Sequence, residues 1–138
     1  NPDLLPAAAQ KVAAVLAAPL SLKARTLAES QFQQAEAHLE RKDYFRATLA
    51  LFEGAITRVC HRKSFDQANP KDRINRAGAA LRALGSDDWK ALEFLRNQMA
   101  HGVATDWHDL MVVAKNPTEL ERLLTRFLTT IPELTERA

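Results

Sequence analysis

The chain of 138 residues is 46% hydrophobic and 26% charged, and it carries a net charge of +2. This length suits one domain, which buries about 68% of its unfolded surface around one core. The lone cysteine, Cys60, excludes an intramolecular disulfide framework and favours a reducing cytoplasm, and no apolar run is long enough to predict a membrane-spanning helix.

Apolar residues recur at three- and four-residue steps, which predicts an all-α bundle of about five or six helices in a single domain, residues 1–138. Short helices are predicted at Pro6–Ala18 and Asp106–Ala114. Residues 110–113 fit a strand equally well by periodicity, but no strand partner is visible, so helix is favoured. The longer helices are predicted, in chain order, at Ser21–Arg41, Asp43–Arg62, Lys71–Leu84, between the cap Ser86 and the stop Gly102, and at Asn116–Ile131.

Helical spacing also predicts which side chains face the core in the two middle helices. These are Phe45, Leu49, Phe52, Ile56 and Val59 in one helix, and Ile74, Ala77, Leu81 and Leu84 in the next. Gly54 lies inside the first of them, where glycine costs about 1 kcal/mol relative to alanine. We therefore expect another backbone to approach closely at Gly54. Cys60 lies on the apolar face of the same helix, which predicts a buried and unreactive thiol.

The last predicted helix has the clearest end signals. Asn116 is a suitable N-cap, Pro117 suits the first helical position, and Glu119 follows three residues after the cap. Pro132 is expected to end this helix, because proline cannot continue an interior helical hydrogen-bond pattern.

The helix between Ser86 and Gly102 carries the polar residues of most interest. Its apolar stripe consists of Trp89, Leu92, Leu95 and Met99. Three polar residues, Arg96, Asn97 and His101, are crowded into its last two turns.

The seven residues from Arg96 to Gly102 read R-N-Q-M-A-H-G. This heptapeptide resembles the R-N-x-x-A-H-G form of the signature of HEPN domains, a family of helical ribonucleases. The segment Tyr44–Glu53 is similar to the first long core helix of HEPN domains attached to CARF sensors in type III CRISPR ancillary nucleases. The resemblance covers the helical effector region only, and implies a HEPN-like helical bundle.

The activity implied by this resemblance is metal-independent cleavage of single-stranded RNA, without a cofactor, by attack of the 2′-hydroxyl on the adjacent phosphate. The nucleophile is already part of the substrate and lies beside its target. His101, with an ordinary pKa of about 6.5, would exchange a proton near neutral pH. Arg96 would stabilise charge developing on the phosphoryl oxygens, and Asn97 would orient His101 or the phosphate. These three are the predicted catalytic residues, and no metal ligand is predicted.

The spacing within the motif raises a geometric problem. Five residues at about 100° each place Arg96 and His101 about 140° apart on an ideal helix, so one straight helix does not aim both at one phosphate. Either the helix ends or distorts before His101, as Gly102 permits, or two chains each supply part of the site. The resemblance implies the second solution, a homodimer with a two-fold interface.

The middle of the chain is basic. Between Arg41 and Arg82, ten Lys or Arg residues occur with four Asp or Glu, a local net charge of +6. We expect a surface beside the motif helix that attracts phosphate, with Arg58 and Arg62 as RNA-binding residues. Ordinary solvated helix faces are the competing interpretation, which the lack of an aromatic stacking ladder favours.

Other roles for the same residues stay open. Glu53 is a candidate polar partner for Arg96, although a solvated or intrahelical partner is the stronger expectation for that acid. In a purely structural interpretation, Arg96 pairs with a nearby carboxylate such as Glu93, and His101 caps the helix end. Capping and the helix dipole explain the remaining cluster better than metal binding does. That cluster consists of Asp106, His108 and Asp109.

Because the chain begins with Asn1 rather than Met, we expect a processed or excised piece of a longer protein with an N-terminal sensor domain. The resemblance implies a cytoplasmic setting in CRISPR-type antiviral defence, with a cyclic oligoadenylate acting on that sensor. The alternative function is a non-catalytic HEPN module of the toxin–antitoxin type, which dimerises or binds nucleotide or RNA. No glycine-rich phosphate loop, C-x-x-C pair, H-E-x-x-H or G-x-S-x-G motif supports another enzyme class.

Overall fold

The computed structural model describes residues 20–101 and 115–138, and within them the chain forms an all-α helical bundle, as predicted. The predicted helices at 6–18 and 106–114 lie outside the described residues. The elements, in chain order, are α2 (Leu20–Glu40), α3 (Tyr44–Lys63), η2 (Asp72–Ala77), α4 (Gly78–Arg82), α5 (Asp87–His101) and α7 (Pro117–Thr135).

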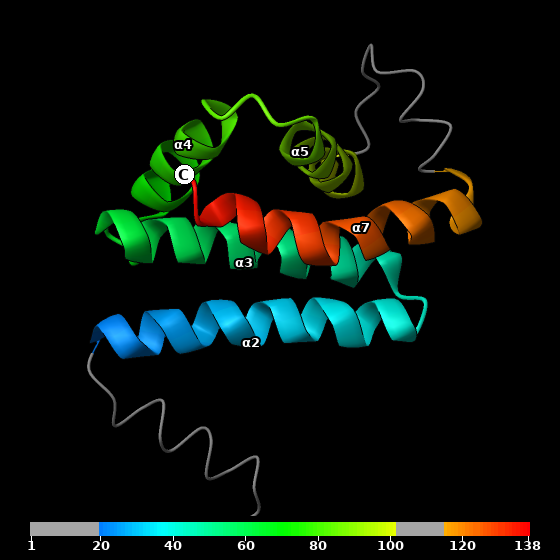
Figure 1. Cartoon of the computed structure of the whole chain (residues 1–138), viewed down its shortest axis with the longest axis horizontal. Coiled ribbons are helices and arrows are strands. Elements are labelled where there is room, and N and C mark those ends of the chain that lie inside the picture. Colours follow the sequence, from blue (N-terminus) through cyan, green and yellow to red (C-terminus); the bar gives the residue numbers. More distant parts are fainter. Residues whose placement is uncertain (1–19, 102–114) are drawn as a thin grey trace, which may run out of the picture.

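Helix α3 is the centre of the bundle. It packs against α2, η2, α5 and α7, so every other long element shares part of its surface (Figure 1). Helices α2, α3 and α7 run alongside one another, and α4 and α5 lie on the side of α3 away from α2. The core therefore surrounds α3, whose Leu51, Ala55, Ile56 and Val59 are fully buried.

The apolar stripe predicted for α5 is buried. Trp89, Leu92 and Leu95 have no exposed surface, and Met99 packs against the same core while partly exposed. Burial of a large apolar side chain stabilises the fold by about 1.5–3 kcal/mol, so these contacts hold α5 on the bundle. The described helices include none with the length and apolarity needed to cross a bilayer.

The predicted helix caps are present. The Trp89 backbone N–H donates to Ser86 Oγ at 3.3 Å, and the Thr118 and Glu119 N–H groups donate to Asn116 Oδ1 at 3.1 and 3.3 Å. These bonds satisfy N–H groups that have no partner inside the helix. Short-range side-chain chemistry therefore determines where α5 and α7 begin.

Two predicted core positions are exposed, and a third, Leu49, is only partly buried and lies outside the core cluster. Phe45 is 47% exposed and Ile74 is 38% exposed. Ile74 lies in η2, a π-helical segment whose i→i+5 hydrogen bonds change the rotation per residue, so the α-helical spacing used for the prediction does not apply there. Phe45 is the second residue of α3, in its first turn.

Gly54 has a different neighbour from the one predicted. A Cβ atom at this position would lie 2.8 Å from Cε1 of the Phe32 ring. The group that approaches Gly54 is thus an aromatic side chain of α2, not a second backbone. Glycine here lets the Phe32 ring lie flat against α3, which explains its place inside a helix.

Pro132 does not end α7. The helix continues to Thr135 with Pro132 inside it. Proline removes one backbone donor, but the turn that follows is held by other contacts, because Arg62 of α3 donates to the Thr135 carbonyl and the Thr135 hydroxyl donates to the Pro132 carbonyl. Contacts with α3 therefore extend the helix past a residue that would end it in isolation.

Candidate functional site

Arg96 lies on the core-facing side of α5. It follows Trp89 by seven residues, which places the two positions about 20° apart around the helix axis and about 10 Å apart along it. Trp89 is fully buried, and Arg96 is half-buried. A guanidinium on the apolar stripe of a helix must find compensation for lost water contacts.

An aromatic ring and an amide provide that compensation. The Arg96 Cζ atom lies 4.8 Å from the centre of the Phe52 ring, and Arg96 Nη1 donates to Asn97 Oδ1 at 3.1 Å. The Phe52 ring stacks on Trp89 with 5.3 Å between centroids and 15° between planes. One ring of α3 thus contacts two residues of α5 that are two helical turns apart.

Most other arginines of the described residues form an ion pair with a carboxylate, and Arg96 does not. Eight of them pair with a carboxylate within 4.0 Å: Arg46, Arg58, Arg62, Arg73, Arg76, Arg82, Arg122 and Arg126. Among the described residues, no carboxylate lies within ion-pair distance of Arg96. Within the described part of the chain, its guanidinium is therefore oriented by neutral groups.

The two acids suggested as partners of Arg96 pair with other arginines. Glu53 Oε2 accepts from Arg73 Nη2 at 2.9 Å, and the same nitrogen lies 3.0 Å from Thr57 Oγ1. Glu93 accepts from Arg82 at 2.7 Å. Neither acid therefore pairs with Arg96. The partner of Glu53 is also not a residue of its own helix, because Arg73 belongs to the π-helical segment η2.

His101 is the last residue of α5, and its side chain lies outside the described residues. The helix remains α-helical from Asp87 through His101, so it neither ends nor distorts before the histidine. The backbone positions of Arg96 and His101 are consequently about 140° apart around the axis. Of the three predicted catalytic residues, the structure brings Arg96 and the exposed Asn97 into contact.

Arg58 and Arg62 lie in a different environment from the one predicted. Both reach the end of α7, where Arg58 Nη1 is 3.5 Å from Glu136 Oε1 and Arg62 donates to the Thr135 carbonyl. Arg58 also lies over the Phe32 ring at 5.1 Å. These two arginines hold helices together at the end of α3, and their contacts are with α2 and α7, not with α5.

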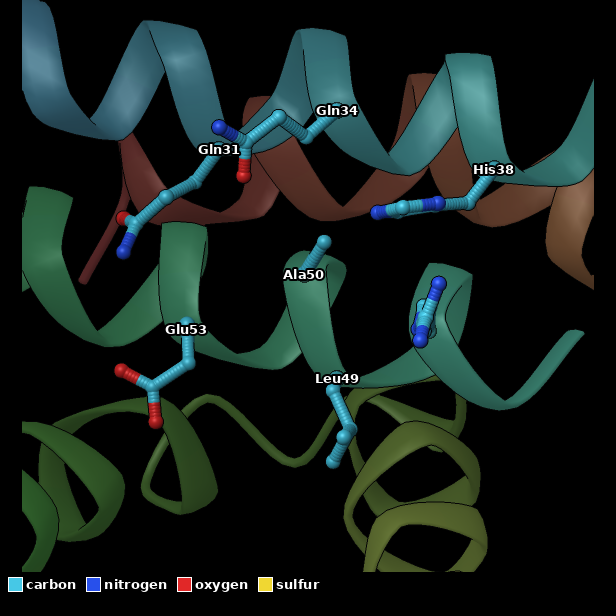
Figure 2. A pocket seen from close by; sticks show the side chains of 7 residues that line it. Gln31, Gln34, His38, Leu49, Ala50 and Glu53 are labelled. Atoms are coloured by element: carbon cyan, nitrogen blue, oxygen red, sulfur yellow. The ribbon is translucent and has the colours of Figure 1, made fainter. Parts of the chain in front are cut away.

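A shallow groove of about 270 Å³ lies between α2 and α3. Gln31, Gln34 and His38 of α2 face it from one side, and Leu49, Ala50 and Glu53 belong to the α3 side (Figure 2). Its lining contains no residue of α5, so the groove is separate from Arg96. The His38 ring is tied to its own helix end, because Nδ1 lies 2.9 Å from Arg41 Nη2.

The other candidate residues, Cys60 and the acidic and histidine residues, form no second candidate site within the described part of the chain. Cys60 is buried, as predicted, and forms no disulfide; burial raises the pKa of its thiol, which disfavours the reactive thiolate. Within residues 20–101 and 115–138, no group of three or more His, Cys, Asp or Glu residues has a metal-binding arrangement. The cluster of Asp106, His108 and Asp109 lies outside the described residues.

Sequence patterns alone did not identify Phe52 as a site residue. It was expected only as a core residue, which it is, with 3% of its surface exposed. One signal was present in the sequence. Arg96 stands seven residues after Trp89, on the same stripe of the helix, and this spacing favours an aromatic partner for the guanidinium.

Comparison of the chain with models of protein families, with curated proteins and with solved structures finds no significant match.

Proposed function

We propose that this chain is a HEPN-type endoribonuclease domain that cleaves single-stranded RNA, with Arg96, Asn97 and His101 as its catalytic residues. The observation that supports this proposal best is the half-buried Arg96 guanidinium, which is oriented by Phe52 and Asn97 and has no described carboxylate beside it. A cation oriented by neutral groups is suited to bind an anion, because the anion compensates a positive charge that no carboxylate of the described residues pairs with.

The chemistry follows from the three residue types. The 2′-hydroxyl loses its proton and its oxygen attacks the adjacent phosphorus, while the bond from phosphorus to the 5′-oxygen breaks and that oxygen gains a proton. The products are a 2′,3′-cyclic phosphate and a 5′-hydroxyl end. His101 supplies the proton exchange, a contribution of about 10² to 10⁴ in rate, and Arg96 stabilises the negative charge on the phosphoryl oxygens. The proposal requires no metal.

The proposal includes a homodimer. Because α5 is continuous through His101, one chain carries Arg96 and His101 on different sides of the helix. Two chains related by a two-fold axis can place Arg96 of one beside His101 of the other, which gives two equivalent composite sites. The wider setting implied by the motif, an effector in CRISPR-type defence governed by a sensor that binds cyclic oligoadenylate, belongs to the same proposal.

Cleavage of a labelled single-stranded RNA in EDTA tests the activity. We expect the parent chain to produce 2′,3′-cyclic phosphate ends, and Arg96→Ala and His101→Ala to produce none. Arg82→Ala is the matched control, since Arg82 is paired with Glu93, and it should cleave normally. An RNA with a single 2′-deoxy nucleotide at the cleavage position should stay intact. Equal cleavage by the parent and both site variants would refute the proposal.

A mixing experiment tests the composite site. Co-refolded Arg96→Ala and His101→Ala chains form mixed dimers in which one of the two sites is complete, so about a quarter of parental activity should return. No recovery, in a mixture that sedimentation shows to be dimeric, would assign both residues to a site within one chain.

A second candidate function is a non-catalytic HEPN module that binds RNA or nucleotide. The same continuity of α5 favours it, because a single chain then presents Arg96 without His101 at one phosphate. Binding of RNA that Arg96→Ala weakens, with no cleavage by the parent chain, would select this function.

A further inference from the structure

We infer that Phe52, supported by Trp89, is a positioning residue that fixes the Arg96 guanidinium for an RNA phosphate. The kinetic part of this inference rests on the proposed function, whereas the geometric part does not. The ring of Phe52 is almost completely buried, so its place is determined by the core around α3. A side chain held there by packing can serve as a rigid surface for a neighbouring flexible one.

The contacts limit the guanidinium in two ways. Its Cζ lies 4.8 Å from the centre of the Phe52 ring, which restrains it in one direction through the attraction of a cation to an aromatic face. The bond from Nη1 to Asn97 Oδ1 restrains its rotation in the plane. Arginine has many rotamers in solution, and two restraints of this kind remove much of the entropy that anion binding would otherwise lose.

Trp89 makes the ring itself rigid. Its indole is fully buried and stacks on Phe52 with 15° between the ring planes. Stacked pairs contribute about 0.5–1.5 kcal/mol beyond the area that they bury. Trp89 and Arg96 belong to α5 and Phe52 belongs to α3. The stacked pair therefore also fixes the position of α5 relative to α3 near Arg96.

The ring contact is measurable without RNA. A guanidinium over an aromatic ring experiences a ring current, so the Arg96 side-chain Nε–Hε signal should be displaced upfield in the NMR spectrum of the parent chain. In Phe52→Leu the signal should return to the position of a solvent-exposed arginine. Phe127→Leu is the matched control, because Phe127 is a fully buried ring of α7, and it should lose packing energy without moving the Arg96 signal.

Kinetics test the positioning role. In Phe52→Leu we expect kcat on single-stranded RNA to fall about 10- to 100-fold, with KM changed by less than about threefold, because a misplaced donor affects the transition state more than substrate binding. Phe127→Leu should keep the parental kcat, and Phe52→Tyr, which retains a ring, should recover most of it. Pentafluorophenylalanine at position 52 keeps the ring shape but reverses its quadrupole, so it should behave like Phe52→Leu.

Equal effects of Phe52→Leu and Phe127→Leu on kcat and on the Arg96 signal would overturn the inference, since general packing would then explain both. If the parent chain does not cleave RNA, the proposed function fails but the geometric inference is still decided. In that case the geometric inference is overturned if Phe52→Leu leaves the Arg96 signal unmoved. It is supported if Phe52→Leu binds a 2′-deoxy oligonucleotide more weakly than Phe127→Leu does.

Discussion

The arginines at the end of α3 and the arginine of α5 differ in the groups that surround them: the first contact an acid, and the second contacts neutral groups. At the end of α3, Arg58 and Arg62 contact the Glu136 carboxylate, and Arg62 also donates to the Thr135 carbonyl of α7. On α5, Arg96 contacts a phenyl ring and a neutral amide. In the sequence all three are arginines within predicted helices, so residue type alone does not separate them.

The difference shows that an arginine indicates a phosphate-binding site only when its ion-pair partners are also known. An arginine paired with a carboxylate and a helix C-terminus is part of the internal structure, and an RNA phosphate would have to replace these contacts. An arginine restrained by neutral groups keeps its charge available for a phosphate. We therefore expect mutations at the two places to affect different properties of the protein.

The largest expected difference concerns cleavage. Arg96→Ala should lower kcat on single-stranded RNA by about 10² to 10³, because in the proposed mechanism Arg96 is the cation that stabilises charge on the phosphoryl oxygens. Arg62→Ala should cleave at the parental rate once the folded fraction is corrected. Initial rates at saturating RNA measure both. The distinction between the two regions breaks down if Arg62→Ala is impaired as strongly as Arg96→Ala.

The next effect concerns the surroundings of Arg58. Gly54→Ala should destabilise the fold by about 1–3 kcal/mol, because its Cβ overlaps the Phe32 ring, over which Arg58 lies. Gly78→Ala is the control: its Cβ meets only the flexible end of Arg82 at 3.3 Å, so alanine should be neutral or stabilise by up to about 1 kcal/mol. Urea denaturation measures both variants. Equal stability of Gly54→Ala and the parent would show that the ring moves without penalty.

A smaller effect on stability is expected at the end of α7. Arg62→Ala should lower the free energy of unfolding by about 1 kcal/mol, since it removes a charged donor from the Thr135 carbonyl in the turn after Pro132. Arg122→Ala, which breaks an exposed pair with Glu119 in the same helix, should change it by less than about 0.5 kcal/mol. If both variants unfold at the same urea concentration, Arg62 does not hold α7 and its assignment to the internal structure is lost.

The smallest effect concerns Lys42, whose hydrogen bond to Glu121 raises the pKa of its amine above the ordinary 10.5. A raised pKa in the folded state means that the pair stabilises the fold fully below pH 10.5 and loses this contribution as the pH rises through the raised value. Because the Lys42 side chain is 62% exposed, the effect should be slight. The difference in unfolding midpoint between the parent and Lys42→Met should therefore shrink above pH 10.5, and a constant difference would contradict the assignment.

Local signals predicted much of the fold correctly. Ser86 and Asn116 cap α5 and α7 as expected, and the buried stripe of α5 follows its apolar spacing. The misplaced positions are those where the local rules of the α-helix did not apply. Ile74 is exposed because η2 is π-helical, and α7 passes Pro132 because α3 supplies contacts to the turn beyond it.

For the candidate site, the heptapeptide from Arg96 to Gly102 selected α5, but sequence spacing did not predict the partners of its arginine. The acids suggested by proximity in sequence, Glu53 and Glu93, pair with Arg73 and Arg82 instead. Such choices depend on which helices pack together, and sequence spacing carries no information on that.

The order of residues by itself determined the helical class, the caps and the apolar stripes, because hydrogen bonding and amphipathic spacing act over three or four residues. Tertiary packing alone decided that Arg73 and Arg82 pair with Glu53 and Glu93. It also decided that Arg96 lies over the Phe52 ring. The reason is that these partners belong to other helices, so the contact between Arg96 and the Phe52 ring exists only once α3 and α5 pack together.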